Sequence, residues 1–218
     1  MRSFLFPQSA ALTLMLMVSA PGWAIDPATM ANSGNATVAA CASCHGKDGG
    51  GQVSFPRMAG MNAIYLRKQL QDFASGRRAN PIMQPVAKAL SRDDHIAMAN
   101  YYAALPVPAA LVRPTAPVTG AGDVGARLAT RGKWSEGVPA CIQCHGPGGV
   151  GVGDSFPSLA GQPAGYIAAQ LKAWKDGTRK NDPLELMRHL SGRLSDGEID
   201  AVSQWFARQP VVAAGGPS

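Results

Sequence analysis

Apolar side chains recur with helical spacing in two segments, residues 65–80 and 166–181. In each segment they follow the i, i+4, i+7 pattern of one helical face, at Leu66, Leu70 and Phe73 and at Ile167, Leu171 and Trp174. Gly76 and Gly177 stand where such helices should end, because glycine readily adopts the left-handed backbone of a helix C-terminus. The pattern predicts one amphipathic helix in each segment.

A second pair of helices is predicted over residues 90–105 and 194–209. Each opens with a serine, Ser91 or Ser195, whose hydroxyl is suited to accept a hydrogen bond from a free backbone N–H. Ser195 and Glu198 have the spacing of a capping box. One face of the later helix carries Ile199, Val202 and Phe206. Since no segment shows the strict alternation of a half-buried strand, the predicted fold class is all-α.

The chain is a tandem repeat. Residues 41–50, 55–60, 65–80 and 90–105 match 141–150, 156–161, 166–181 and 194–209. The offset between matched segments grows from 100 to 104, as small loop insertions would cause. Residues 106–122 between the repeats are rich in proline and lack an amphipathic period, which predicts a semi-extended linker. We therefore predict two tandem domains, residues 31–105 and 123–210.

The N-terminus has the features of an export signal. Arg2 supplies a positive charge, residues 10–20 form a short apolar run, and residues 22–24 end in a small-residue cleavage pattern. The run is shorter than the roughly 20 apolar residues of a membrane span. We predict a signal peptide over residues 1–24 and a periplasmic protein; a retained N-terminal anchor is the alternative.

The charge and composition of the chain indicate which classes of binding partner to expect. The formal net charge is +6, but lysine and arginine are scattered rather than gathered with stacking aromatics, so nucleic-acid binding is not predicted. A mildly basic face favours an acidic protein or an anionic membrane, and an ordinary solvated surface is equally consistent. Each repeat is short enough that a large planar cofactor would help to complete its core.

The four cysteines of the chain occur in two C-x-x-C-H motifs, Cys41, Cys44 and His45 and Cys141, Cys144 and His145. Two thiols one helical turn apart can both add to the vinyl groups on one edge of a porphyrin. The adjoining imidazole then projects toward the iron, which is the attachment pattern of c-type haem. The motifs predict two covalently attached haem c groups, with a histidine as an iron ligand of each.

Two other chemistries use similar residues. Cysteine and histidine are both zinc ligands, and the two motifs together contain four thiols. A zinc knuckle does not, however, require an adjoining histidine in both copies. A thioredoxin-like redox pair has the same cysteine spacing but belongs to a βαβ context that the pattern lacks.

The chain resembles the dihaem cytochrome c4 family over essentially the whole mature sequence. The resemblance rests on the C-x-x-C-H-G segments, the F-P-x-[ML]-A-G stretches, the Y-[LI]-x-x-Q-L helices and the closing L-S-x-x-[DE] helices. It implies two class I cytochrome c folds, packed face to face, that work as an electron carrier.

The repeat predicts methionine as the second axial ligand in both halves. Met187 is the one methionine of the second repeat, and the offset of 104 aligns it with Met83. Both also occupy the ligand position of the family, and a thioether opposite histidine raises the reduction potential. Met58, Met61 and Met98 align with other residue types and are interpreted as packing residues.

Two histidines remain outside the motifs. His189 lies two residues after Met187 and is the alternative ligand there. His95 lies in the first turn of a capped helix and is expected to be exposed. Neither has a counterpart histidine in the other repeat, which argues against a shared role in binding a cofactor.

Three pairs of residues are candidates to support the haems: Pro56 and Pro157, Arg78 and Arg179, and Tyr65 and Tyr166. In the family the proline carbonyl accepts a hydrogen bond from the proximal imidazole, although a simple turn would explain the prolines too. The arginines are candidates for bidentate pairing with haem propionates, and exposed arginines are the alternative. The tyrosines either donate to propionates or only pack.

An iron with histidine and methionine on its two faces has no open position for a substrate. We therefore predict an electron carrier rather than an enzyme, working as a monomer between redox partners such as a respiratory complex, a terminal oxidase or a dehydrogenase. Peripheral membrane association is an alternative to a freely soluble protein. The rival functions are a haem subunit of a dehydrogenase or oxidase complex and a dihaem peroxidase, which needs a vacant iron site and acid–base groups.

The repeats are not identical around the predicted haems. Met61 stands where the second repeat has Gln162, and the methionine loop of the first repeat is three residues shorter, as the rise of the offset from 101 to 104 shows. These differences predict unequal haem environments and unequal reduction potentials.

Overall fold

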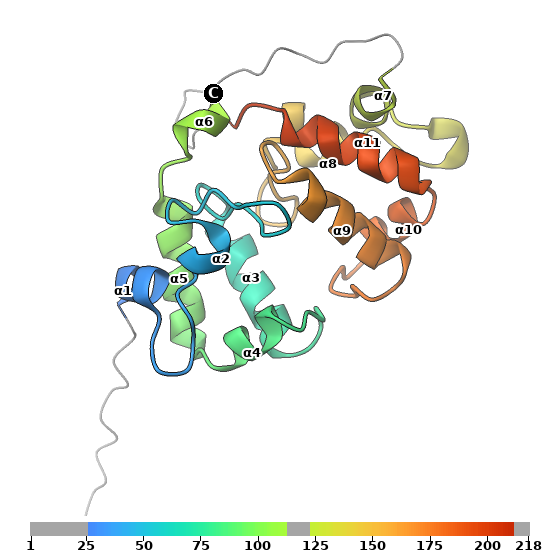
Figure 1. Cartoon of the computed structure of the whole chain (residues 1–218). Helices are drawn as coiled ribbons and strands as arrows, with labels where there is room; N and C mark the ends of the chain where they lie inside the picture. Colours follow the sequence, from blue (N-terminus) through green and yellow to red (C-terminus); the bar gives the residue numbers. More distant parts are fainter. Residues whose placement is uncertain (1–25, 113–122, 212–218) are drawn as a thin grey trace, which may run out of the picture.

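The computed structural model describes residues 26–112 and 123–211. The chain forms two helical halves, which Figure 1 shows in blue to green and in yellow to red, with α6 (Ala109–Val112) above the first half. Within the described residues there are no strands, only isolated bridges such as that between Arg78 and Arg179. The all-α prediction is confirmed.

The two halves repeat one order of elements. The first half contains α1 (Pro27–Ser33), α2 (Ala42–His45), α3 (Ala63–Ala74), α4 (Met83–Lys88) and α5 (Arg92–Ala104). The second contains α7 (Val124–Thr130), α8 (Ile142–His145), α9 (Ala164–Lys175), α10 (Leu186–Ser191) and α11 (Asp196–Ala207), with short 3₁₀ turns η1 (Trp134–Glu136) and η2 (Pro147–Gly149). In each half the long helices pack together, α3 on α5 and α9 on α11. The structure thus preserves the internal repeat of the sequence.

Local capping determines where the last helix of each half begins. The Ser195 side chain accepts from the backbone N–H of Glu198, whose carboxylate accepts from the Ser195 backbone N–H. Ser91 and Asp94 make the same reciprocal pair at α5. Both predicted N-caps are confirmed, and the capping box of α5 uses aspartate where that of α11 uses glutamate.

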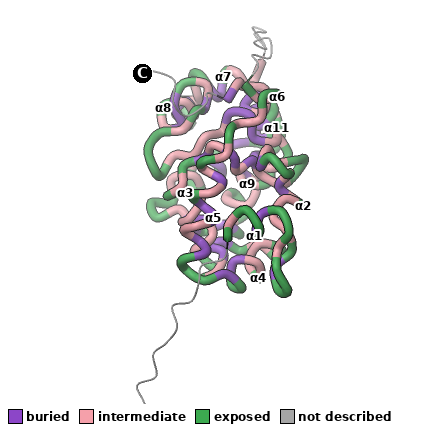
Figure 2. The backbone as a smooth tube through the Cα atoms, turned by 90° about the vertical axis from the view of Figure 1, so that its left-hand side faces the viewer, coloured by how far each residue is buried: buried purple, intermediate pink, exposed green. Residues whose placement is uncertain are grey.

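Each half buries its own apolar core, and buried residues of both halves appear as purple stretches of the backbone tube in Figure 2. The core of the second half joins α7, α9 and α11 and includes Leu128, Leu171, Ile199, Val202, Trp205 and Phe206. Gly125 makes this packing possible, because a Cβ there would lie 2.3 Å from the carbonyl oxygen of Ala201 on α11. The smaller core of the first half includes Met30, Val38, Leu90, Met98 and Tyr102. Met30 belongs to α1, which begins at Pro27, before the predicted domain boundary.

The segment predicted as a semi-extended linker is partly helical. Residues 109–112 form α6, which corrects the prediction for this part of 106–122. The carbonyl of Leu111 accepts a hydrogen bond from the backbone N–H of Val211, 2.8 Å away, so the start of the segment contacts the end of the second half. Residues 113–122 of the linker and the predicted signal peptide lie outside the described residues. No helix within residues 26–112 and 123–211 is long and apolar enough to cross a membrane.

Candidate haem sites

The two C-x-x-C-H motifs form single helical turns. Cys41 and Cys141 precede α2 and α8, and His45 and His145 end them. None of the four cysteines forms a disulfide, and all lie half-buried. Burial raises the pKa of the Cys41 thiol and raises that of Cys141 to about 11. Among the described residues, no cluster of three or more Cys, His, Asp or Glu side chains is arranged to hold a metal ion.

Both motif histidines are held by a proline carbonyl. The Nδ1 of His45 lies 3.0 Å from the carbonyl oxygen of Pro56, and the Nδ1 of His145 lies 2.8 Å from that of Pro157. A carbonyl only accepts, so Nδ1 must carry the proton. Burial lowers the pKa of both imidazoles and favours their neutral form. Each ring therefore keeps a lone pair on Nε2, the atom that can bind a metal.

The two predicted methionine ligands occupy matching places. Met83 is the first residue of α4, and its backbone N–H donates to Oδ1 of Asn80 at 2.8 Å. Met187 lies in the first turn of α10, and its N–H donates to the carboxylate of Asp182. Both side chains are half-buried. In each half a short polar side chain just upstream fixes the backbone of the methionine, a feature that the sequence analysis did not identify.

The other methionines and histidines considered as ligands differ in how far they are buried. Met61 and Met98 are buried and Met58 packs on the core of the first half, in agreement with a packing role. His189 is exposed. His95 was expected to be exposed, and this is wrong: its ring is buried, and Nε2 lies 2.9 Å from the carbonyl oxygen of Ala87. The reason is that α5 turns this side chain toward the preceding helix rather than toward solvent.

Arg78 and Arg179 meet where the two halves join, and the alternative that they are exposed is wrong. They are 5% and 4% exposed. Their guanidinium groups hydrogen-bond to neutral side chains from both halves: Gln69, Tyr166 and Gln170 for Arg78, and Gln69, Gln170 and Asn181 for Arg179. Burial and the neighbouring Arg78 lower the pKa of Arg179. Two buried cations without a bonded carboxylate among the described residues suit an anionic group.

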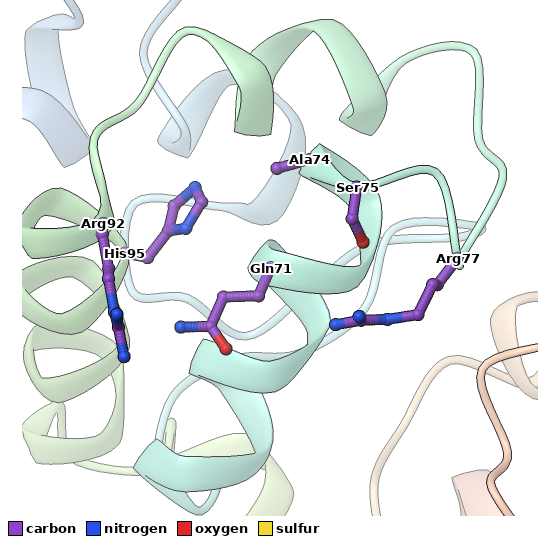
Figure 3. A pocket seen from close by; sticks show the side chains of 6 residues that line it. All are labelled: Gln71, Ala74, Ser75, Arg77, Arg92 and His95. Atoms are coloured by element: carbon purple, nitrogen blue, oxygen red, sulfur yellow. The ribbon is translucent and has the colours of Figure 1, made fainter.

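These features fit a haem in each half. The thiols lie one turn apart, each imidazole presents Nε2, a thioether stands on a matching helix, and the buried arginines suit propionates. A cavity of about 370 Å³ elsewhere does not belong to this set. Figure 3 shows that it lies between α3 and the start of α5, and its lining consists of Gln71, Ala74, Ser75, Arg77, Arg92 and His95. None of the predicted haem ligands lines it.

Comparison with known proteins agrees with this geometry. Residues 31–105 match the family model described as cytochrome c, and residues 137–206 match that of the cytochrome c oxidase cbb3-type subunit III. Cytochrome c4 of Pseudomonas aeruginosa is 36% identical over 81% of this chain and 87% of its own length. A reduced recombinant cytochrome c4 from Pseudomonas stutzeri superposes with a TM-score of 0.67 at 33% identity, over 78% of this chain and 93% of that one.

The chain belongs to the cytochrome c4 family. As a dihaem c-type cytochrome it is an electron carrier, and its two haem c groups are attached through the cysteine pairs Cys41 and Cys44 and Cys141 and Cys144. Its fold is the pair of cytochrome c domains that the sequence predicted.

Two further similarities are to proteins whose names refer to thiosulfate dehydrogenase. A protein of Stutzerimonas stutzeri named thiosulfate dehydrogenase electron acceptor is 49% identical over 95% of this chain and 96% of its own length. The structure of the thiosulfate dehydrogenase TsdBA from Marichromatium purpuratum superposes with a TM-score of 0.78 at 42% identity. That similarity covers 87% of this chain but 41% of the longer one.

Proposed function

We propose that this cytochrome accepts electrons from a thiosulfate-oxidising dehydrogenase in the periplasm. The observation that carries the proposal is the similarity, over almost the full length of both chains, to the relative named as that acceptor. Oxidative joining of two thiosulfate ions through a new S–S bond releases two electrons, and a pair of haem c groups would take one electron each. The protein then delivers these electrons to a further redox partner as a monomer.

The proposed iron ligands are His45 and Met83 in the first half and His145 and Met187 in the second. Haem iron supplies reversible one-electron transfer when it is bound. The prolines orient the imidazoles through the Nδ1 hydrogen bonds, and the side chains of Asn80 and Asp182 position the methionines. A haem held by histidine and methionine would leave no iron position for a substrate, which favours a carrier over a peroxidase.

The test is direct reduction by the proposed donor. Oxidised holoprotein is mixed with a purified thiosulfate dehydrogenase and thiosulfate, and the reduced-haem absorption is followed by stopped flow. We expect both haems to be reduced, and thiosulfate without the dehydrogenase to reduce neither at a comparable rate. The matched control is Pseudomonas aeruginosa cytochrome c4, which should be reduced more slowly.

If dithionite reduces both haems but the dehydrogenase does not, the donor assignment is wrong and the carrier function stands. A stable complex with the dehydrogenase on gel filtration would instead favour a permanent subunit. The joined chain of TsdBA, in which a region similar to this protein is part of a longer dehydrogenase, is the observation that makes this second arrangement worth testing.

A further inference from the structure

The duplication breaks at the point where the two halves meet. In the matched stretches 55–60 and 156–161, Arg57 of the first half corresponds to Ser158 of the second. Directly after them, Met61 corresponds to Gln162. In the structure these four residues form one contact between the halves. This contact is therefore asymmetric, unlike the meeting of the matched Arg78 and Arg179.

Arg57 is a buried cation with neutral partners. The residue is 1% exposed. Its Nη1 donates to the carbonyl of Ala59 at 2.5 Å, and its Nη2 donates to Ser158 Oγ at 2.9 Å and to the carbonyl of Ala160 at 3.2 Å. Its Nε has no partner among the described residues. The guanidinium thus joins the two halves without an ion pair.

Gln162 completes the contact from the other half. Its Oε1 accepts from the backbone N–H of Arg57 at 3.0 Å, and its Nε2 donates to the Arg57 carbonyl at 2.9 Å and to Met61 Sδ at 3.1 Å. Arg57 follows Pro56, and Ser158 follows Pro157, the two carbonyls that hold the haem histidines. Arg57 therefore belongs to the loop that holds His45 and contacts, at Ser158, the loop that holds His145; these are the two proximal loops.

A buried charge of this kind lowers the stability of the folded state. Removing a guanidinium from water is unfavourable, and hydrogen bonds to neutral groups compensate less than a carboxylate would. Burial lowers the pKa of Arg57 only to about 10, so the side chain is still cationic at neutral pH. An apolar residue of similar size would fill the same space at a lower cost in folding free energy. The charge itself is the feature that needs an explanation.

We propose that Arg57 is a tuning residue that raises the reduction potentials of both haems. Oxidation adds one positive charge to each iron centre, and a fixed cation buried nearby disfavours that state. Because water does not surround Arg57, its field is weakly screened and reaches both proximal loops. The proposal rests on the two haems of the family and not on the identity of the electron donor.

The test is a mediated redox titration of the holoprotein. Arg57→Met should lower both midpoint potentials, with the equilibrium constant for reduction falling about tenfold, which is about 59 mV for a one-electron couple. Arg57→Lys keeps the positive charge, so its two midpoint potentials should stay close to the wild-type values. Ser158→Ala removes a hydrogen bond but no charge and should leave both potentials near the wild-type values. Arg92→Met removes an exposed charge and is the control for a change in net charge.

Unchanged potentials in Arg57→Met would overturn the proposal. So would a loss in Arg57→Lys or Ser158→Ala equal to that in Arg57→Met, because the effect would then come from bonding rather than charge. Arg57→Gln, which is neutral but can still donate hydrogen bonds, replaces Arg57→Met if that variant does not fold. The titration uses no dehydrogenase, so its outcome is independent of the proposed donor.

Discussion

At the scale of single residues, the internal repeat separates ligands from packing residues that look alike in the sequence. Met83 and Met187 lie in the first turns of matching helices, and in each the backbone N–H donates to an upstream polar side chain. Met61 and Met98 are buried, and other residue types occupy their places in the second half. His189, by contrast, is exposed. Equivalent position, rather than residue type, therefore supports the two methionines as ligands.

Replacing Met187 tests that assignment. In Met187→Ala the red charge-transfer band of ferric methionine ligation should fall to about half, because one iron of two loses its thioether, and one midpoint potential should drop. Optical spectroscopy with a redox titration measures both. Met98→Leu, a similar-volume change in the core, should leave the band intact. If His189→Ala rather than Met187→Ala halves the signal, the ligand of the second iron is His189.

At the scale of elements, short polar contacts determine where helices start, and the cores determine which faces they present. The capping boxes at α5 and α11 satisfy backbone donors that have no partner within the helix. The close approach of α7 to α11 depends on Gly125, where no larger residue fits. Caps are readable from sequence because they involve neighbours three residues apart, while the glycine contact joins residues far apart in the chain.

Removing the cap of α11 should destabilise the second half. Ser195→Ala leaves the N–H of Glu198 without its acceptor, so we expect the free energy of unfolding to fall by about 1 kcal/mol. Denaturant unfolding of the holoprotein measures the change. Ser155→Ala, an exposed serine in a turn, is the matched control and should be close to neutral. An equal loss in the two variants would mean that the cap contributes nothing.

At the scale of the whole molecule, the described contacts between the halves are rich in hydrogen bonds. Asp72 of α3 is almost fully buried, and its carboxylate accepts from Asn181 Nδ2 of the other half at 2.8 Å. Burial opposes its ionisation, but hydrogen bonds from Lys68, Asn181 and Arg77 outweigh this and lower its pKa below the ordinary value of 3.8. The ionised carboxylate therefore helps to hold the halves together.

The sign of the resulting pH dependence follows from that lowered pKa. The unfolded chain binds a proton at Asp72 more readily than the native one, so its contribution is present above pH 3.8 and is lost as pH falls through the native pKa. Asp72→Asn should be less stable than wild type at neutral pH, and the difference should shrink in acid. Denaturant unfolding across that pH range measures it, with Asp93→Asn as the exposed control. A difference that does not vary with pH would contradict the role of the carboxylate.

Much of the site could be predicted because it is local or repeated. The cysteines and histidine of each motif are neighbours on one helical turn, and the duplication aligns Met83 with Met187 without any knowledge of the fold. Errors arose where burial depends on distant packing, as with His95 and the helical part of the linker. Residues such as Asn80 and Gln162 carry no motif, so only their contacts reveal them.

The sequence by itself determined the helical class, the two-domain plan and the haem attachment chemistry, since periodicity, duplication and covalent spacing are properties of the linear chain. Only the tertiary structure decided how the halves meet. Arg57, Ser158 and Gln162 differ between the repeats, and their contacts join residues about a hundred positions apart. Whether a lone arginine is solvated or buried as a charge depends on what folds over it, and no local pattern encodes that.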